Sequence, residues 1–73
     1  MRRFLIVIEK ANGNYSGYSP DLPGCVATGT TVEQTEANMY EAIRLHLEGL
    51  REDGVTIPEP QAIAEYIVLA ETA

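Results

Sequence analysis

Two short segments of the sequence consist entirely of apolar residues, the first at positions 4–8 and the second at positions 66–69. Both are rich in β-branched and aromatic side chains, which favour extended strands. A strand with one face in water alternates apolar and polar residues, and neither segment does so. We therefore expect strands at residues 3–11 and 64–70 whose two faces are both buried.

Turn-forming residues divide the region between these segments. Asn12-Gly13 tolerates the positive φ that a hairpin turn requires, so a second strand is expected at residues 15–19. The run Pro20-Asp21-Leu22-Pro23-Gly24 is the densest turn signal in the chain, with Gly24 suited to a positive φ. A short third strand at residues 25–28 would complete an antiparallel meander.

A single amphipathic helix is predicted between Thr31 and Gly54. Thr31 is a favourable N-cap, and Gln34 three residues later completes a capping box. Gly54 suits the left-handed residue that follows a helix, and Pro58 cannot continue it. Apolar or small residues recur at helical spacing in between, at Val32, Thr35, Met39, Ala42, Ile43, His46, Leu47 and Leu50.

The element order β-β-β-α-β predicts one α+β domain over residues 1–73, with the helix packed on one sheet face. One helix leaves the other face uncovered, although the first and last strands are apolar on both faces. We therefore expect a homo-oligomer, most simply a homodimer, that buries the second face or an edge strand. The candidate interface residues are Leu5, Val7, Ile67 and Leu69.

The small size of the chain also indicates a partner. In 73 residues, the free energy gained by apolar burial barely offsets the conformational entropy that folding removes. The single cysteine, Cys25, excludes an internal disulfide, and with the single histidine, His46, it offers no zinc site. Oligomerisation or complex formation is the remaining source of stability.

Eleven acidic and five basic residues give a formal net charge of −6, which disfavours nucleic-acid binding by this chain alone and suits a basic protein partner. Solubility alone would also explain the charge. Tyrosine is enriched at protein interfaces, although core packing explains it equally well here. No segment is long and apolar enough to be a membrane helix or a signal peptide, so a cytoplasmic protein is expected. The candidate partner-binding residues are Tyr15, Tyr18, Asp21, Glu33, Glu41 and Glu48.

No arrangement of residues predicts catalysis. Glu9, Asp21 and Glu65 could meet at strand ends and hold a metal, but charged residues beside strands are normally solvated. Cys25 and His46 lack an orienting third group, and a core role suits both better. The glycines match no nucleotide-binding spacing, so neither enzymatic activity nor a cofactor is expected.

The middle of the chain resembles the HicB antitoxin family. The shared features are Tyr15 and Tyr18, the Pro20–Cys25 turn, Gly29 with Thr31, and the helix residues Asn38, Glu41-Ala42-Ile43 and Leu45-His46-Leu47. The resemblance covers positions 15 to about 60. It implies a truncated ribonuclease-H-type domain without catalytic carboxylates, which occludes HicA, a small basic toxin that cleaves messenger RNA.

Members of the family often carry a C-terminal DNA-binding domain, and a chain ending at Ala73 leaves no room for one. We therefore expect a chain that does not bind an operator by itself. Two functions remain open. The first is an antitoxin that neutralises a HicA-like toxin, and the second is an orphan self-assembling protein of the same fold. A neighbouring reading frame for a small basic protein would favour the first.

Overall fold

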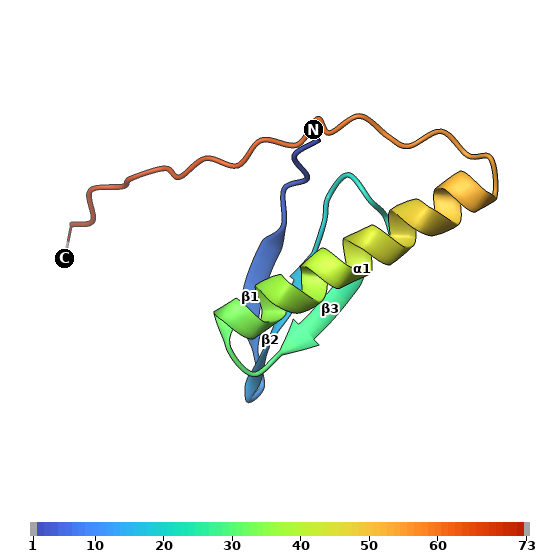
Figure 1. The fold of residues 1–73 in the computed structure, drawn as a ribbon. Helices are drawn as coiled ribbons and strands as arrows, with labels where there is room; N and C mark the ends of the chain where they lie inside the picture. Colours follow the sequence, from blue (N-terminus) through green and yellow to red (C-terminus); the bar gives the residue numbers. More distant parts are fainter. Residues whose placement is uncertain (1, 73) are drawn as a thin grey trace.

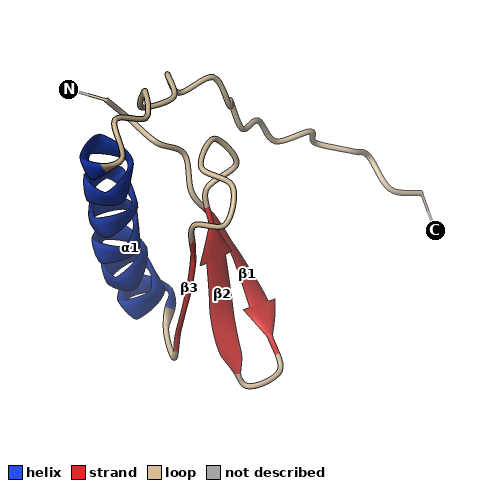
Figure 2. Ribbon diagram, turned by 90° about the vertical axis from the view of Figure 1, so that its right-hand side faces the viewer, coloured by secondary structure: helices blue, strands red, loops and turns tan. Residues whose placement is uncertain are grey.

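The computed structural model describes residues 2–72, which form a three-stranded sheet and one long helix (Figure 1). The elements in chain order are β1 (Val7–Ala11), β2 (Asn14–Tyr18), β3 (Val26–Gly29) and α1 (Val32–Glu52). The strands form an antiparallel meander in the order β1-β2-β3, and the helix covers one face of it (Figure 2). The predicted α+β class, the meander and the helix are confirmed.

The register of the sheet decides which side chains lie beneath the helix. Ile8, Gly17 and Ala27 form one cross-strand row, and Val7, Tyr18 and Val26 form the next. A Cβ added at Gly17 would lie 3.0 Å from Cγ of Met39 in α1, so the Gly17 row faces the helix. Because successive strand residues point to opposite faces, the Val7 row lies on the bare face.

The first strand begins later than expected, at Val7 instead of residue 3. Val7 pairs with Tyr18, so Leu5 would stand opposite Pro20, which has no N–H to donate. The Ser19 hydroxyl instead donates to the carbonyl oxygen of Leu5 at 2.9 Å. The turn after β2 thus ends the pairing, and residues 3–6 run on without a neighbouring strand.

Both ends of α1 are capped as the sequence predicts, with one difference. Thr31 Oγ1 accepts from the Gln34 N–H at 3.0 Å, but the Gln34 side chain reaches back to the N–H of Thr30, not of Thr31. At the other end, Gly54 has φ 68°. The Gly54 N–H donates to Arg51 O and the Val55 N–H to Leu50 O, the two hydrogen bonds of a Schellman motif.

A small core joins the helix to the turn that follows β2. Leu22, Cys25 and Met39 are its buried apolar residues. Leu22 is fully buried, although it lies between two prolines in a segment that otherwise signals an exposed turn. The helix lies mainly over β3 and β2 and contacts β1 least, so the β1 side of the sheet is thinly covered.

The expected last strand, residues 64–70, does not form within the described chain, and this part of the predicted order is corrected. After Gly54 the backbone is extended as far as residue 72 and carries no strand pairing. It passes the N-terminal segment and then leads away from the sheet (Figures 1 and 2). A strand requires a hydrogen-bonded neighbour, and this path gives the segment none. Among residues 2–72, no helix combines the length and the apolar character of a membrane span.

Candidate partner-binding surfaces

The two candidate tyrosines lie on opposite faces of the sheet. Tyr15 pairs with Lys10 and Gly29 in a row on the helix side, and it is half-buried. Tyr18 lies in the Val7 row on the bare face, with 41% of its surface exposed. The two rings therefore cannot belong to one contact surface, and only Tyr18 is open on the uncovered face.

An apolar patch crosses the bare face of the sheet. It consists of Val7, Tyr18 and Val26, one from each strand, and we call it the sheet-face patch. Val26 is 63% exposed. Of the four predicted interface residues, Val7 belongs to the patch and Leu5 lies just before β1. Ile67 and Leu69 lie on the extended segment, so the described chain does not bring the two pairs together.

A groove runs between α1 and the segment that leads into β1. Its apolar lining comes from Phe4 and Ile6 on one side and from Ala37, Tyr40 and Ile43 on the other, with a hollow of about 400 Å³. We call it the flank groove. It continues along the helix into a second hollow of about 480 Å³, which Arg2, Arg44 and Arg51 border. Tyr40, which is 68% exposed, forms part of the wall of both hollows.

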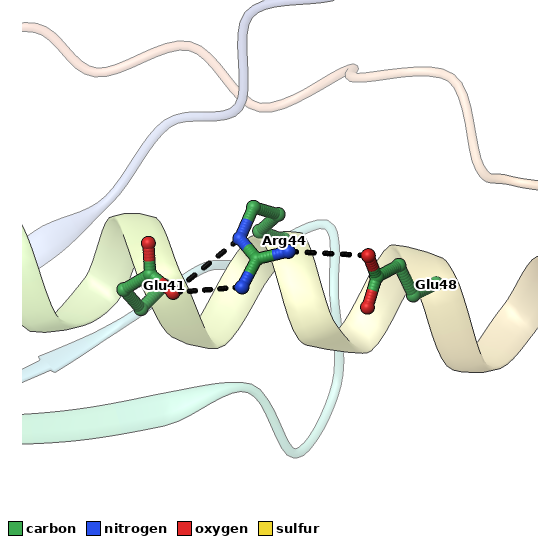
Figure 3. Close-up of polar contacts among 3 residues, drawn as sticks. All are labelled: Glu41, Arg44 and Glu48. Carbon is green, nitrogen blue, oxygen red and sulfur yellow. Dashed lines mark hydrogen bonds and ion pairs between the residues drawn. The ribbon is translucent and has the colours of Figure 1, made fainter.

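The outer side of α1 is less acidic than its sequence suggests, because Arg44 neutralises part of the charge (Figure 3). Its Nη2 lies 3.0 Å from Oε2 of Glu41, and its Nη1 lies 3.1 Å from Oε1 of Glu48. The hydrogen bond and the charge of Glu41 raise the pKa of Arg44 above its ordinary value. Two of the four predicted acidic contacts, Glu41 and Glu48, thus share one cation, and together with Arg44 they carry a single net negative charge.

Glu33 lies in the first turn of α1 and is exposed. The unpaired N–H groups of the first turn carry a partial positive charge, so a carboxylate there stabilises the helix. Its place in the first turn gives Glu33 a structural role beside any contact with a partner.

Asp21 connects the turn after β2 to the segment that follows the helix. Its carboxylate accepts from the N–H of Gln61 at 3.2 Å and from the N–H of Ala62 at 3.1 Å. These hydrogen bonds join residues about forty positions apart in sequence. We call this pair of bonds the Asp21 clamp. Asp21 is therefore engaged within the chain, and its carboxylate is not free for a partner in this arrangement.

Two features of the described chain concern the residues considered for catalysis. Cys25 is buried in the core, and burial raises the pKa of its thiol, which favours the unreactive protonated form. Among residues 2–72 there is no group of three or more His, Cys, Asp or Glu side chains that could hold a metal ion. Glu9, Asp21 and Glu65 are thus not gathered in the described chain.

Sequence reasoning did not identify the flank groove. Its helix wall includes Tyr40. Tyr40 lies next to Met39 but is not one of the apolar or small residues that recur at helical spacing along α1. A large aromatic residue beside this series of apolar residues was the feature of the sequence that could have indicated the groove. Asn38 was also missed as a structural residue, since its Nδ2 donates to the carbonyl oxygen of Thr28 at 2.8 Å and holds α1 to β3.

Comparison with known proteins gives consistent matches. An uncharacterized 14.9 kDa protein of Haemophilus phage HP1 is 42% identical over 62 residues, which are 85% of this chain and 47% of that protein. This chain thus spans about half the length of the phage protein. A UPF0150 protein of Thermoplasma acidophilum is 34% identical over 62 residues, 85% of this chain and 90% of that protein.

A solved structure described as the HicA3 and HicB3 toxin–antitoxin complex contains a chain of similar fold. The match has a TM-score of 0.66 and 32% sequence identity, and it covers 80% of this chain and 72% of the other. The family model for HicB-like antitoxins of bacterial toxin–antitoxin systems matches residues 4–72. The match includes the clamped turn, the helix and the extended segment, and this chain belongs to the HicB-like antitoxin family.

Proposed function

We propose that this chain is the antitoxin of a toxin–antitoxin pair and that it neutralises a small, basic, HicA-like toxin that cleaves messenger RNA. The observation that carries the proposal is the family match over residues 4–72. The likeness to a chain of the HicA3–HicB3 complex supports it, because that fold is known in contact with a toxin. Neutralisation would consist of covering the toxin's RNA-binding surface.

Charge supports a basic partner. The formal net charge is −6, and among residues 2–72 the acidic side chains Glu33, Glu36 and Glu52 of α1 are exposed and form no ion pair. Glu33 and Glu36 belong to the first turns of the helix and Glu52 to its last. A basic RNA-binding surface would meet free carboxylates at both ends of the helix, with the Arg44 cluster between them.

The proposed mode of action is binding, not catalysis. The buried Cys25 thiol supports this, as does the lack of a carboxylate cluster among the described residues. A net charge of −6 argues against nucleic-acid binding by this chain alone. We further propose a ribonuclease-H-related origin of the fold and a cytoplasmic location, where a messenger-RNA-cleaving toxin would meet its substrate.

The association rate with the toxin tests the proposal. The candidate partner is any small basic protein encoded next to this chain, which would be purified and mixed with it in a stopped-flow instrument. We expect association to be fastest at low salt, because charges separated by more than about 10 Å are screened at 0.1 M ionic strength. Glu33→Lys should slow it more than Glu71→Lys, which makes the same charge change outside the helix.

A salt-independent rate that is equal in both variants would refute the electrostatic part of the proposal. Lack of binding at every ionic strength, with both proteins folded, would refute the function. The alternative of an orphan self-assembling protein would then be favoured, and the absence of a neighbouring reading frame for a basic protein would support it.

A further inference from the structure

The segment at residues 63–70, which we call the arm, exposes an unusual amount of apolar surface. Tyr66 is 97% exposed and Val68 94% exposed. The accessible surface of the chain is 5945 Å², whereas a compact 8.0 kDa protein exposes about 4,500 Å². The radius of gyration is 14.8 Å, against about 11 Å for a compact domain of this length. A single copy of the chain therefore exposes apolar surface that contact with another segment or chain could bury.

The outer edge of β1 offers unpaired backbone groups to a strand. Ala11 pairs with Asn14 across the two-residue turn, which makes this closing pair a hydrogen-bonded one. Hydrogen-bonded pairs alternate along an antiparallel ladder, so the N–H and C=O groups of Ile8 and Lys10 point away from β2. No other strand among residues 2–72 lies beside them. Such an edge is a template for another strand.

An apolar groove lies next to the position that this additional strand would occupy. The flank groove lies on the β1 side of α1, between Phe4 and Ile6 and the apolar helix residues Tyr40 and Ile43. A strand beside β1 would place every second side chain against this groove. Its other side chains would extend the sheet-face patch of Val7, Tyr18 and Val26. An apolar residue is thus required at every position of the strand, and positions 66–69 of the arm meet this requirement.

The arm also matches the edge in length and, at the Arg3 end, in charge. Seven residues from position 64 to 70 span about 23 Å as a strand, and residues 4–10 span the same distance. Glu65 and Glu71 flank the apolar part of the arm, and Arg3 and Lys10 flank the edge. In either strand direction one acidic end of the arm meets Arg3, whereas Glu9 beside Lys10 leaves no net charge at the other end of the edge.

The arm starts beside the edge of its own chain but does not follow it. The Asp21 clamp holds Gln61 and Ala62 next to residues 3–6, and the backbone beyond them leads away from the sheet (Figure 1). If the arm folded back onto β1 of its own chain, it would form a fourth strand there. One apolar face of this four-stranded sheet would still be exposed. Exchange between two copies pairs both arms and brings two copies of the chain into contact.

We propose that two copies of this chain form a dimer by exchanging their arms, so that residues 63–70 of each copy add as a strand to the free edge of β1 in the other. Exchange of identical elements is a low-cost route to a closed dimer, since each copy supplies both the strand and the edge. The clamp fixes the point at which the arm leaves its own copy. This interaction does not depend on the toxin, so it stands or falls independently of the proposed function.

Sedimentation equilibrium of the full chain, with two defective variants, tests the exchange. The arm variant is Ile67→Gln with Val68→Gln, and its matched control is Leu45→Gln with Val55→Gln, two exposed apolar residues outside the arm. The edge variant is Lys10→Pro, which removes one outward N–H and leaves the β1–β2 hydrogen bonds intact. Far-UV circular dichroism confirms that each variant retains α1.

We expect the full chain and the control to sediment at twice the 8.0 kDa monomer mass at micromolar concentration. The arm variant and the edge variant should each raise the dimer Kd by at least about tenfold. An equal mixture of the two variants should dimerise more strongly than either variant alone, although less strongly than the full chain. The intact arm of the edge variant can pair with the intact edge of the arm variant, which restores one of the two exchanged pairs.

Several results would overturn the proposal. A folded full chain that stays at the monomer mass would refute the dimer, and an arm variant as dimeric as the control would show that the arm is not in the interface. A mixture that dimerises no more strongly than either variant alone would refute the exchange of arms. An arm that becomes protected from proteolysis only when the toxin is added would assign it to the toxin.

Discussion

Substitution by alanine should change the stability of the chain in opposite directions at two of its glycines, Gly24 and Gly49. Gly24 closes the turn after β2 with φ 83°, a conformation that side chains with a Cβ rarely adopt. Gly49 lies inside α1, where glycine is the least favourable residue apart from proline. A Cβ added at either position meets no atom within 4 Å. Backbone preference alone therefore decides the outcome, without a steric contribution from packing.

The expected magnitudes follow from these conformations. A left-handed residue with a Cβ costs about 1–2 kcal/mol, of which about 0.4–1 kcal/mol is recovered because the unfolded chain also loses freedom. Gly24→Ala should thus destabilise by about 1 kcal/mol, and Gly24→Val by more, because its branched Cβ adds strain. Gly49→Ala should stabilise by about 0.5–1 kcal/mol.

Thermal unfolding followed by circular dichroism at one fixed protein concentration measures the difference, since the Tm of an oligomer depends on concentration. For a chain of this size, 1 kcal/mol corresponds to a shift of about 4–8 °C. We expect Tm to fall for Gly24→Ala, to fall further for Gly24→Val, and to rise for Gly49→Ala. An unchanged or raised Tm for Gly24→Val would refute the account of the turn.

Three further predictions concern stability and reactivity. Gly29→Ala should lower the free energy of unfolding by more than about 2 kcal/mol, because the added Cβ would lie 2.7 Å from the backbone N of Thr35. A denaturant titration measures this, and a variant that unfolds at the same denaturant concentration as the unmodified chain would contradict the close contact. Thr31→Ala should cost about 1 kcal/mol and reduce helicity at the start of α1, whereas Thr56→Ala, in the exposed segment after α1, should leave both unchanged. Cys25 should react with a thiol reagent at pH 8 only as fast as the chain unfolds, and rapid labelling of the folded chain would contradict its burial. Burial raises the pKa of the Cys25 thiol, so its contribution to the free energy of unfolding is complete below the unfolded pKa of 9.0 and declines at higher pH.

Local signals in the sequence predicted the helix and the turns between the strands. The helix could be bounded from Thr31, Gln34 and Gly54 because capping depends on residues a few positions apart. The Asn12-Gly13 and Pro20–Gly24 turns could be placed for the same reason. In the hairpin only Gly13, at φ 77°, has a positive φ, so Asn12 does not share the left-handed conformation.

The errors arose where an outcome depended on distant residues. Residues 3–6 have the composition of a strand, but their pairing ends because Pro20 stands where β2 would have to continue. Leu22 has turn residues on both sides, yet the turn places it against Met39 of the helix. The arm has the composition of a buried strand, and sequence composition does not say which edge, or which copy of the chain, it pairs with.

The candidate partner residues show the same division. Glu41 and Glu48 were singled out as candidate partner contacts, but Arg44 between them was not recognised as their shared counter-ion. Asp21 was singled out for a turn and for partner contact. Its two hydrogen bonds to residues 61 and 62 depend on the tertiary fold, which no local pattern encodes.

The central claim is that this chain neutralises a messenger-RNA-cleaving toxin. It is tested most directly by titrating the chain into an RNA-cleavage assay of a purified HicA-like protein, taken from a reading frame beside that of this chain where one is found. We expect cleavage to fall in proportion to the added chain and to end at a fixed stoichiometric ratio, while the chain alone, with or without Mg²⁺, cleaves nothing. Undiminished cleavage in a molar excess of folded chain, or cleavage by the chain itself that Asp21→Asn abolishes, would contradict the account.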